Sequence, residues 1–182
     1  ISGEARGRTL FAPPGDQTRP TSDKIRGSLF NILGSQVLDA VVLDLFGGTG
    51  ALALEALSRG AARAVIADNS RRAIEVISRN AANVLKDELE ARVRIVKADY
   101  RGAISALGGR FDLVFLDPPY RMTDAYADAM ARLLSTSALT EGAVIVCERR
   151  RDVEIDVPDG FEIYDMRSYG ETAIDFVRRI EG

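Results

Sequence analysis

The chain has 182 residues, of which 46% are hydrophobic and 28% charged, and its formal net charge at pH 7 is −3. This composition is typical of one soluble domain with a buried core, and no apolar run approaches the roughly 18 residues that a membrane-spanning helix needs. The absence of histidine and the single cysteine, Cys147, exclude a Ser-His-Asp triad, a histidine-based zinc site, a disulfide within the chain and a thiolate zinc cluster, so we expect no metal.

The N-terminal part of the chain differs in charge from the remainder. Residues 1–34 carry five basic against three acidic residues, although the chain as a whole is acidic. The chain starts at Ile1 and shows no apolar signal-peptide segment, so we expect a few missing residues and a cytoplasmic protein. A basic segment can contact nucleic-acid phosphates or can be an ordinary solvated surface, and charge alone does not separate these interpretations. Its basic residues are Arg6, Arg8, Arg19, Lys24 and Arg26, and a second basic spot is formed by Arg149, Arg150 and Arg151.

Prolines and glycines divide the first 34 residues. We expect a short strand at residues 8–12 and a turn at residues 13–16, because Pro and Gly interrupt regular structure. Thr21 or Ser22 can cap a helix after Pro20, and Gly34 ends it. We therefore interpret residues 1–20 as an N-terminal arm or β extension and residues 21–182 as the main domain.

From residue 41 onward, apolar runs of strand length alternate with helical patterns. We expect strands at 41–46, 64–67, 93–96, 111–116 and 143–147, and helices at 51–59, 70–85, 100–107 and 125–134. Continuously apolar strands separated by helices predict a doubly wound parallel sheet in an α/β fold. Residues 161–167 and 172–178 have no helix between them and predict an antiparallel C-terminal hairpin.

A glycine-rich turn follows the first of these strands. In an open α/β sheet, ligands bind beyond the carboxyl ends of the strands, and glycines let the backbone approach a ligand closely. Gly48, Gly50 and Ala53 match the dinucleotide-binding fingerprint, which leaves a nicotinamide dehydrogenase open. An acidic residue just before the glycines suits the ammonium of an amino acid better than a pyrophosphate, and the pattern resembles the first motif of S-adenosylmethionine (SAM) methyltransferases. That motif comprises Asp44, Phe46, Gly47, Gly48, Thr49 and Gly50.

Two further aspartates end the second and third strands. Asp68 can accept hydrogen bonds from both ribose hydroxyls, a role that NAD and SAM sites share. Asp99 can accept from an adenine amino group or can be a plain surface residue. Neither residue decides between the cofactors.

The sequence after the fourth strand indicates the chemistry. Asp117, Pro118, Pro119 and Tyr120 offer acceptors without donors, because proline has no N–H group. An exocyclic amino group on a planar ring needs such a partner set, with two acceptors for its N–H bonds and an aromatic face for stacking. The motif therefore predicts methylation of a base amino group.

Residues 117–120 carry the signature of amino-group N-methyltransferases that act on adenine, cytosine or guanine. Together with residues 19–33 and 43–50, they resemble the bacterial 16S ribosomal RNA (guanine-N2) methyltransferase family, RsmD, to which residues 3–8 and 169–172 are also similar. The resemblance covers almost the whole chain. It implies a seven-stranded Rossmann-like methyltransferase sheet with a small N-terminal β-hairpin. Because the sequence starts at Ile1, we expect that the first strand of this hairpin can be incomplete.

The resemblance implies transfer of a methyl group from SAM to the N2 amino group of a guanine in 16S ribosomal RNA, naked or within a small subunit or assembly intermediate. The implied catalytic residues are Asp117, Pro118, Pro119 and Tyr120. The implied cofactor residues are Asp44, Phe46, Gly47, Gly48, Thr49, Gly50, Asp68, Asn69, Asp99 and Tyr100. The RNA-binding candidates are Arg6, Arg8, Arg19, Lys24 and Arg26.

Two other functions remain open at this point. A DNA adenine-N6 methyltransferase shares the residue 117–120 motif, although no target-recognition domain is visible. A non-catalytic RNA-binding assembly factor could keep the fold, although the intact motif opposes it. We expect the protein to be a monomer.

Overall fold

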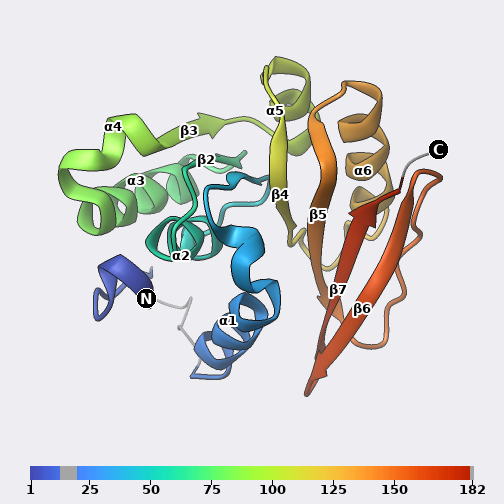
Figure 1. The fold of residues 1–182 in the computed structure, drawn as a ribbon, viewed down its shortest axis with the longest axis horizontal. Coiled ribbons are helices and arrows are strands. Elements are labelled where there is room, and N and C mark those ends of the chain that lie inside the picture. The colour runs from blue at the N-terminus through green and yellow to red at the C-terminus, as the bar shows by residue number, and fades with distance from the viewer. Residues whose placement is uncertain (13–19, 181–182) are drawn as a thin grey trace.

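The computed structural model describes residues 1–12 and 20–180 (Figure 1). Its seven strands form one sheet in the order β3-β2-β1-β4-β5-β7-β6. The strands are β1 (Val41–Asp44), β2 (Arg63–Asp68), β3 (Val93–Lys97), β4 (Phe111–Leu116), β5 (Leu139–Arg150), β6 (Phe161–Tyr169) and β7 (Thr172–Arg179). The first five run parallel, and β7 is antiparallel to both β5 and β6. The doubly wound parallel sheet that the sequence predicts is confirmed, and the sheet has the seven strands that the family resemblance implies.

The described residues also form six α-helices and three 3₁₀ turns. The α-helices are α1 (Pro20–Leu33), α2 (Ala51–Ser58), α3 (Arg71–Leu85), α4 (Leu89–Arg92), α5 (Tyr100–Ala106) and α6 (Ala125–Ser135). The 3₁₀ turns are η1 (Gly3–Ala5), η2 (Gly34–Val37) and η3 (Lys86–Glu88). Of these elements, η1, α1 and η2 precede the first strand. No helix in the described ranges has the length and apolar character needed to cross a membrane.

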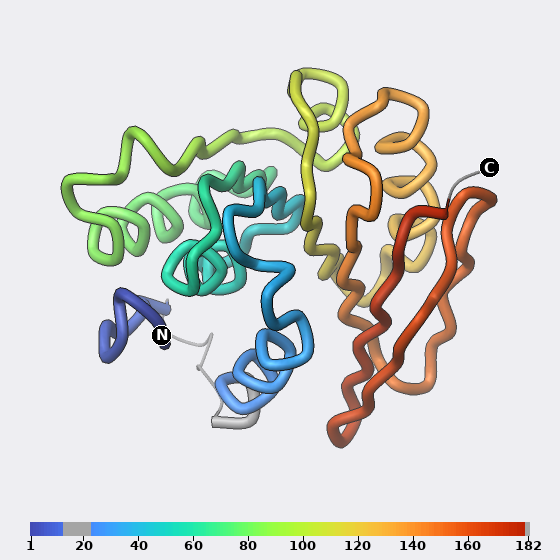
Figure 2. The backbone as a smooth tube through the Cα atoms, in the orientation of Figure 1, coloured from blue at the N-terminus to red at the C-terminus, as the bar shows by residue number. Residues whose placement is uncertain are grey.

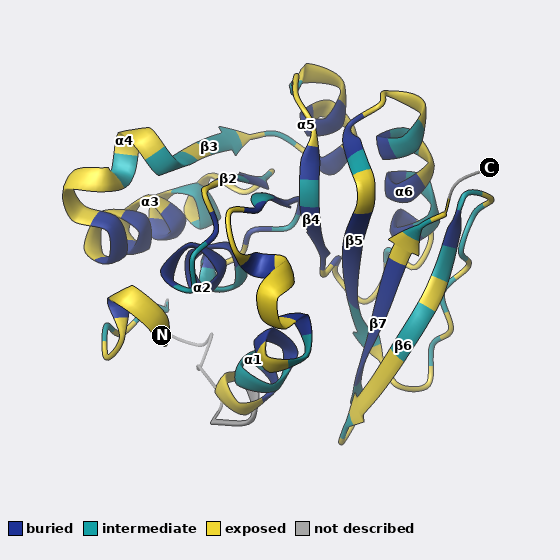
Figure 3. Cartoon of the chain, in the orientation of Figure 1, coloured by how far each residue is buried: buried dark blue, intermediate teal, exposed yellow. Residues whose placement is uncertain are grey.

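Successive strand residues point to opposite faces of the sheet, and each face has its own core. On one face, Leu113 and Phe115 of β4 pack with α1, α2 and α3. On the other face, Val114 and Leu116 pack with α5 and α6. The buried central strands and the exposed outer helix surfaces in Figure 3 follow from this two-layer covering. Cys147 belongs to the second core and is fully buried, as expected of a core residue.

The chain start differs from the predicted short strand at residues 8–12. Among the described residues this segment pairs with no strand, and the side chain of Asn80 on α3 bonds its backbone instead. The Phe11 N–H donates to Asn80 Oδ1 at 2.6 Å, and Asn80 Nδ2 donates to the Phe11 carbonyl at 3.0 Å. The N-terminal β-hairpin that the family resemblance implies is therefore absent from residues 1–12. Helix α1 also begins at Pro20 itself, one or two residues before the predicted caps, since proline is tolerated at the first helical position.

The C-terminal elements are longer than the sequence pattern indicates. Strand β5 extends over Leu139–Arg150, because Leu139 pairs with Phe111 across an irregularity and Arg150 pairs with Thr172 of β7. Figure 2 shows the backbone leaving β5 and returning as the hairpin of β6 and β7 at the edge of the sheet. The predicted hairpin is confirmed, with Gly170 at φ +60° in its turn.

Candidate active site

A cavity of about 880 Å³ lies over the carboxyl ends of the parallel strands. The strand order changes direction at β1, whose neighbours are β2 and β4, and this is where α/β sheets bind ligands. We call this space the site cavity. Of the predicted residues, it brings together Phe46, Gly48, Asp68, Asn69, Asp99, Tyr100, Asp117, Pro118, Pro119 and Tyr120. Four predicted cofactor residues do not line it directly, namely Asp44, Gly47, Thr49 and Gly50.

The three glycines after β1 serve different purposes. A Cβ atom at Gly47 would lie 2.6 Å from the Ile66 side chain, so this glycine allows the loop to pack on β2. Gly50 adopts φ +84° as the N-cap of α2. Gly48 adopts φ +60°, and a Cβ atom there would meet nothing within 4 Å. Only Gly48 therefore offers the open backbone that a bulky ligand can approach.

Asp44 lies buried beneath this loop, at the end of β1. Its Oδ1 accepts a hydrogen bond from the Phe46 N–H at 3.1 Å, and no basic side chain in the described residues forms an ion pair with it. Burial raises the pKa of Asp44 to about 7, and the negative charges of Asp68 and Glu148 add to this effect. A cationic amino group next to Asp44 would supply the missing counter-charge, which fits the ammonium of an amino-acid ligand.

Asp68 joins the end of β2 to the glycine loop. Its carboxylate accepts hydrogen bonds from the Gly48 N–H at 3.0 Å and from the Ser70 N–H at 2.9 Å. Ser70 caps α3 through the Ala73 N–H, as the sequence predicts. The half-buried carboxylate faces the site cavity and keeps acceptor capacity for ligand hydroxyls.

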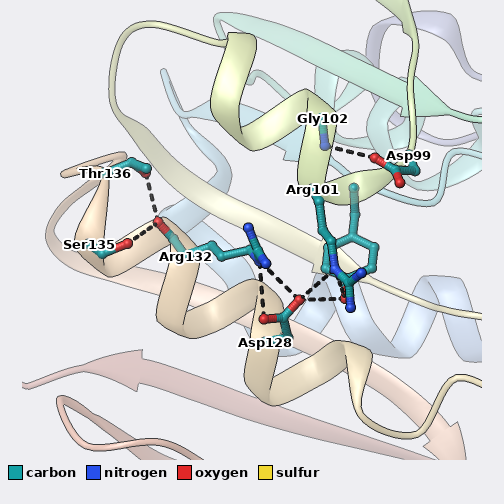
Figure 4. A network of polar contacts seen from close by, with 8 residues as sticks. Asp99, Arg101, Gly102, Asp128, Arg132, Ser135 and Thr136 are labelled. Atoms are coloured by element: carbon teal, nitrogen blue, oxygen red, sulfur yellow. Dashed lines mark hydrogen bonds and ion pairs between the residues drawn. The ribbon is translucent and has the colours of Figure 1, made fainter.

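Asp99 and Tyr100 lie at the start of α5, the helix that follows β3. Asp99 Oδ1 caps the helix by accepting from the Gly102 N–H at 2.7 Å, so this exposed carboxylate has a structural partner beside its place in the cavity wall. The buried Tyr100 ring lies 5.5 Å from that of Phe46, and its hydroxyl donates to Asp128 of α6 at 2.6 Å. Figure 4 shows Asp128 between Arg101 and Arg132, with Nε–Oδ2 distances of 3.0 Å to both. This network fixes α5 against α6 and holds one wall of the site cavity.

Residues 117–120 form the opposite wall, directly after β4. No described residue donates a hydrogen bond to the Pro118 carbonyl, which leaves this acceptor available to a ligand. The Tyr120 side chain is 76% exposed, and the Arg150 guanidinium lies 5.6 Å from its ring centroid. An exposed aromatic ring beside two acceptors matches the expected partner set for a stacked base.

Glu148 is a site residue that the sequence analysis missed. It follows Cys147 on β5, which pairs with Leu116 of β4, so Glu148 and Asp117 occupy equivalent places on neighbouring strands. Both side chains line the site cavity, and the negative charge of Glu148 raises the pKa of Asp117. The sequence did show an acidic residue at the carboxyl end of the predicted strand 143–147. It could be assigned to the site only once β5 was known to lie beside β4.

The two carboxyls of this pair hold a proton more tightly than isolated ones. Asp117 is exposed at the cavity, yet protein atoms surround its carboxyl closely enough that desolvation raises its pKa well above the ordinary value. The like charges of Glu148 and Asp44 raise the pKa of Asp117 further. Desolvation also raises the pKa of Glu148, while the neighbouring Asp117 carboxyl opposes this shift.

The predicted RNA-binding residues do not gather at the site cavity. Arg8 donates to the Val84 carbonyl at the far end of α3, and the 13% exposed Arg26 forms ion pairs with Asp23 and Glu55 at 3.2 Å. Arg6 and Lys24 are exposed but do not line the cavity, and Arg19 lies outside the described residues. The basic side chains at the cavity are instead Arg101, Arg121 and Arg149, with Arg150 over Tyr120.

Of these arginines, Arg149 has a structural role. Its guanidinium forms a buried ion pair with Asp175 of β7, with an Nε–Oδ2 distance of 2.6 Å. It also donates to the carbonyls of Arg151 and Val153, which fixes the chain after β5. The three consecutive arginines of the sequence therefore do not form one free basic patch.

Comparison with known proteins agrees with the fold and with the site. The family described as Conserved hypothetical protein 95 matches residues 1–178. Ribosomal RNA small subunit methyltransferase D of Escherichia coli (strain K12) is 38% identical over 180 residues, which cover 98% of this chain and 88% of that protein. The solved structure of yhhF from Escherichia coli has a TM-score of 0.83 and 32% identity, covering 98% of this chain and 96% of that one.

A more distant structure shares the fold alone. It is an RNA methyltransferase from Salinibacter ruber in complex with S-adenosyl-L-homocysteine, with a TM-score of 0.67 and 15% identity, covering 90% of this chain and 95% of that one. The family resemblance stated from the sequence is thus confirmed. The chain belongs to the Conserved hypothetical protein 95 family, that is, to the RsmD-like methyltransferases.

Proposed function

We propose that the protein methylates the N2 amino group of a guanine in 16S ribosomal RNA. Membership of the RsmD-like family makes it a SAM-dependent ribosomal RNA methyltransferase. The guanine atom and the 16S substrate are the finer part of the proposal. The observation that carries it is the acceptor set of Asp117 and the Pro118 carbonyl, placed in one cavity with the Gly48 loop and the exposed Tyr120 ring.

The residues around the glycine loop fit the cofactor. Bound SAM supplies a methyl group that its sulfonium already activates. The open backbone at Gly48 leaves room for a bulky ligand, Asp68 offers acceptors for ribose hydroxyls, and Asp44 is a buried carboxylate without a basic partner among the described residues. These three features would hold the sugar and the amino-acid part of the molecule.

The opposite wall of the cavity would hold the base. The target nucleotide must leave its stack to enter the cavity, as base-modifying enzymes require. Tyr120 would stack on the base, while Asp117 and the Pro118 carbonyl would accept the two N2–H bonds. Most of the rate would come from this positioning, which is worth effective molarities of about 10⁵ M or more. The proton lost from the methylated nitrogen can pass to Asp117, whose raised pKa favours its protonated form.

The RNA backbone would follow the exposed arginines at the cavity mouth. Arg121 lines the site cavity without an ion pair to any described carboxylate, and Arg150 lies over Tyr120. Arg6 and Lys24 remain proposals for a more distant contact, and Arg19 remains a proposal from the sequence. Arg8 and Arg26 are left out of the proposed RNA surface, because their guanidinium groups have partners within the protein.

The test is methyl transfer in vitro. The purified protein and SAM are incubated with free 16S ribosomal RNA and with small subunits, both taken from a bacterial strain that lacks its own RsmD relative. Digestion to nucleosides and mass spectrometry should find N2-methylguanosine. Asp117→Ala should reduce the rate below about a tenth of the unmodified protein, a barrier increase of at least ~1.4 kcal/mol. Asp124→Ala is a matched control, because Asp124 is exposed on the same connection and does not line the cavity. Methylation of adenine in DNA, or an active Asp117→Ala variant, would overturn the proposal.

A further inference from the structure

Glu148 is held so that its side chain lines the site cavity together with Asp117. Its backbone carbonyl accepts a hydrogen bond from the Tyr126 hydroxyl at 2.5 Å, and its backbone pairs with Ile174 of β7. The adjacent Arg149 is engaged by Asp175, so it does not neutralise Glu148. In the described part of the chain, no basic side chain forms an ion pair with either Glu148 or Asp117.

The resulting polar surface accepts hydrogen bonds and donates none when both carboxyls are ionised. It consists of the Asp117 carboxylate, the Pro118 carbonyl and the Glu148 carboxylate. Guanine presents two kinds of donor side by side, its ring N1–H and its N2 amino group. Adenine and cytosine present an amino group next to a bare ring nitrogen, which is itself an acceptor. The acceptor surface therefore complements guanine and opposes the other two bases.

We propose that Glu148 selects guanine by accepting its ring N1–H, while Asp117 and the Pro118 carbonyl hold the N2 amino group. This inference rests on the function proposed above and assigns to that site its base specificity. Desolvation raises the pKa of both carboxyls in the ligand-free protein, and the N1–H and N2–H groups of guanine would stabilise their ionised forms. A base with a bare ring nitrogen would leave Glu148 facing a lone pair, which an acceptor-lined site rejects strongly.

The test compares two bases that differ at the ring nitrogen. Guanine and 2,6-diaminopurine both carry an N2 amino group, but only guanine has N1–H. Oligouridine RNAs with one central guanine or one central 2,6-diaminopurine are titrated with the protein and S-adenosylhomocysteine, and affinity is followed by fluorescence anisotropy. Methyl transfer to the same RNAs is measured separately.

The unmodified protein should bind the guanine RNA about tenfold or more tightly than the diaminopurine RNA, the worth of one hydrogen bond to a charged group. Glu148→Gln should reduce this ratio to about threefold or less, since the amide of glutamine can donate to a bare ring nitrogen. Glu141→Gln, at an exposed position of the same strand, should keep the ratio of the unmodified protein. The ratio of two RNAs on one variant cancels any general loss of folding or RNA affinity.

Two results would overturn the inference. One is equal binding of both RNAs by the unmodified protein, and the other is a Glu148→Gln variant that loses affinity for both RNAs equally. In the second case Glu148 would only position Asp117. If the guanine preference depends on Glu148 but no methyl transfer to N2 occurs, the recognition stands and the proposed function fails. If N2 is methylated but the protein binds the guanine and diaminopurine RNAs with equal affinity, the proposed function stands and this inference fails.

Discussion

The Asp68 carboxylate accepts a hydrogen bond from the Gly48 backbone N–H at 3.0 Å, which joins the end of β2 to the loop after β1. The same carboxylate binds the Ser70 N–H at the start of α3. One acidic side chain therefore organises the glycine loop and lines the cavity that this loop borders. Its position explains why a loop residue and a strand-end residue line the same cavity, which is the proposed cofactor site.

Replacing Asp68 by Ala should weaken SAM binding by about 1.5–3 kcal/mol, the value of a hydrogen bond to a charged group. Isothermal titration of the RNA-free protein measures this directly. Asp87→Ala, an exposed change in η3, should leave the affinity unchanged. Tight NADH binding without any heat from SAM would contradict the cofactor assignment.

Asp44 should link SAM binding to pH. Its pKa in the ligand-free protein is about 7. A ligand ammonium beside it favours the ionised form, so binding near pH 7 should release protons and affinity should increase as pH rises through 7. Titrations in buffers of different ionisation enthalpy detect this release, which Asp44→Asn should reduce. Proton uptake on binding would contradict the assignment of Asp44 to the amino group.

The same residue should reduce stability at higher pH. Because the pKa of Asp44 is raised from 3.8 to about 7 on folding, the folded state holds the extra proton between these values. Stability from this group is therefore greatest below pH 4 and decreases as pH rises to 7. Asp44→Asn should flatten this part of the stability profile, measured by chemical denaturation at several pH values.

Asn80 should be a strong stability determinant, although it is polar. It is 1% exposed and bonds three backbone groups, namely the N–H and carbonyl of Phe11 and the carbonyl of Thr49. Asn80→Ala should lower the free energy of unfolding by about 2–3 kcal/mol, because buried groups lose their partners. Asn83→Ala, on the exposed side of the same helix, should change it by less than about 0.5 kcal/mol. If Asn80→Ala lowered the free energy of unfolding no more than Asn83→Ala, the buried hydrogen bonds of Asn80 would contribute little to stability.

Asn80 and Glu148 also show which features could not be predicted from the sequence. Strands β1 to β4 were predicted to within two residues, because strands buried on both faces have continuous apolar patterns. The residue 47–50 and 117–120 motifs follow β1 and β4 as predicted, and both reach the site cavity because the carboxyl ends of parallel strands share one edge. The roles of Asn80 and Glu148 could not be predicted in this way, since they depend on contacts between segments far apart in sequence. The length of β5 likewise depends on its pairing with β7.

The RNA-binding residues could not be predicted from the sequence for the same reason. The predicted basic residues are close together in the sequence, whereas the arginines at the site cavity are close together only in space. Arg121 and Arg150 are 29 residues apart in the chain, yet one lines the site cavity and the other lies over Tyr120. Arg150 also pairs with Asp152, with an Nη2–Oδ2 distance of 3.0 Å, but both side chains are more than half exposed. A phosphate can therefore compete for this guanidinium.

We expect Arg121→Ala and Arg150→Ala to weaken binding of the ribosomal RNA substrate and to reduce its salt dependence. Each lost phosphate contact on single-stranded RNA should lower the slope of log affinity against log salt by about 0.7. Filter binding at several salt concentrations measures the slope, and SAM affinity should stay unchanged. Arg63→Ala removes the same charge from an exposed position at the start of β2, the edge of the sheet opposite the site cavity, and should leave the slope unchanged. If Arg6→Ala and Lys24→Ala lower the slope while Arg121→Ala and Arg150→Ala do not, the RNA path follows the N-terminal basic residues and not the cavity mouth.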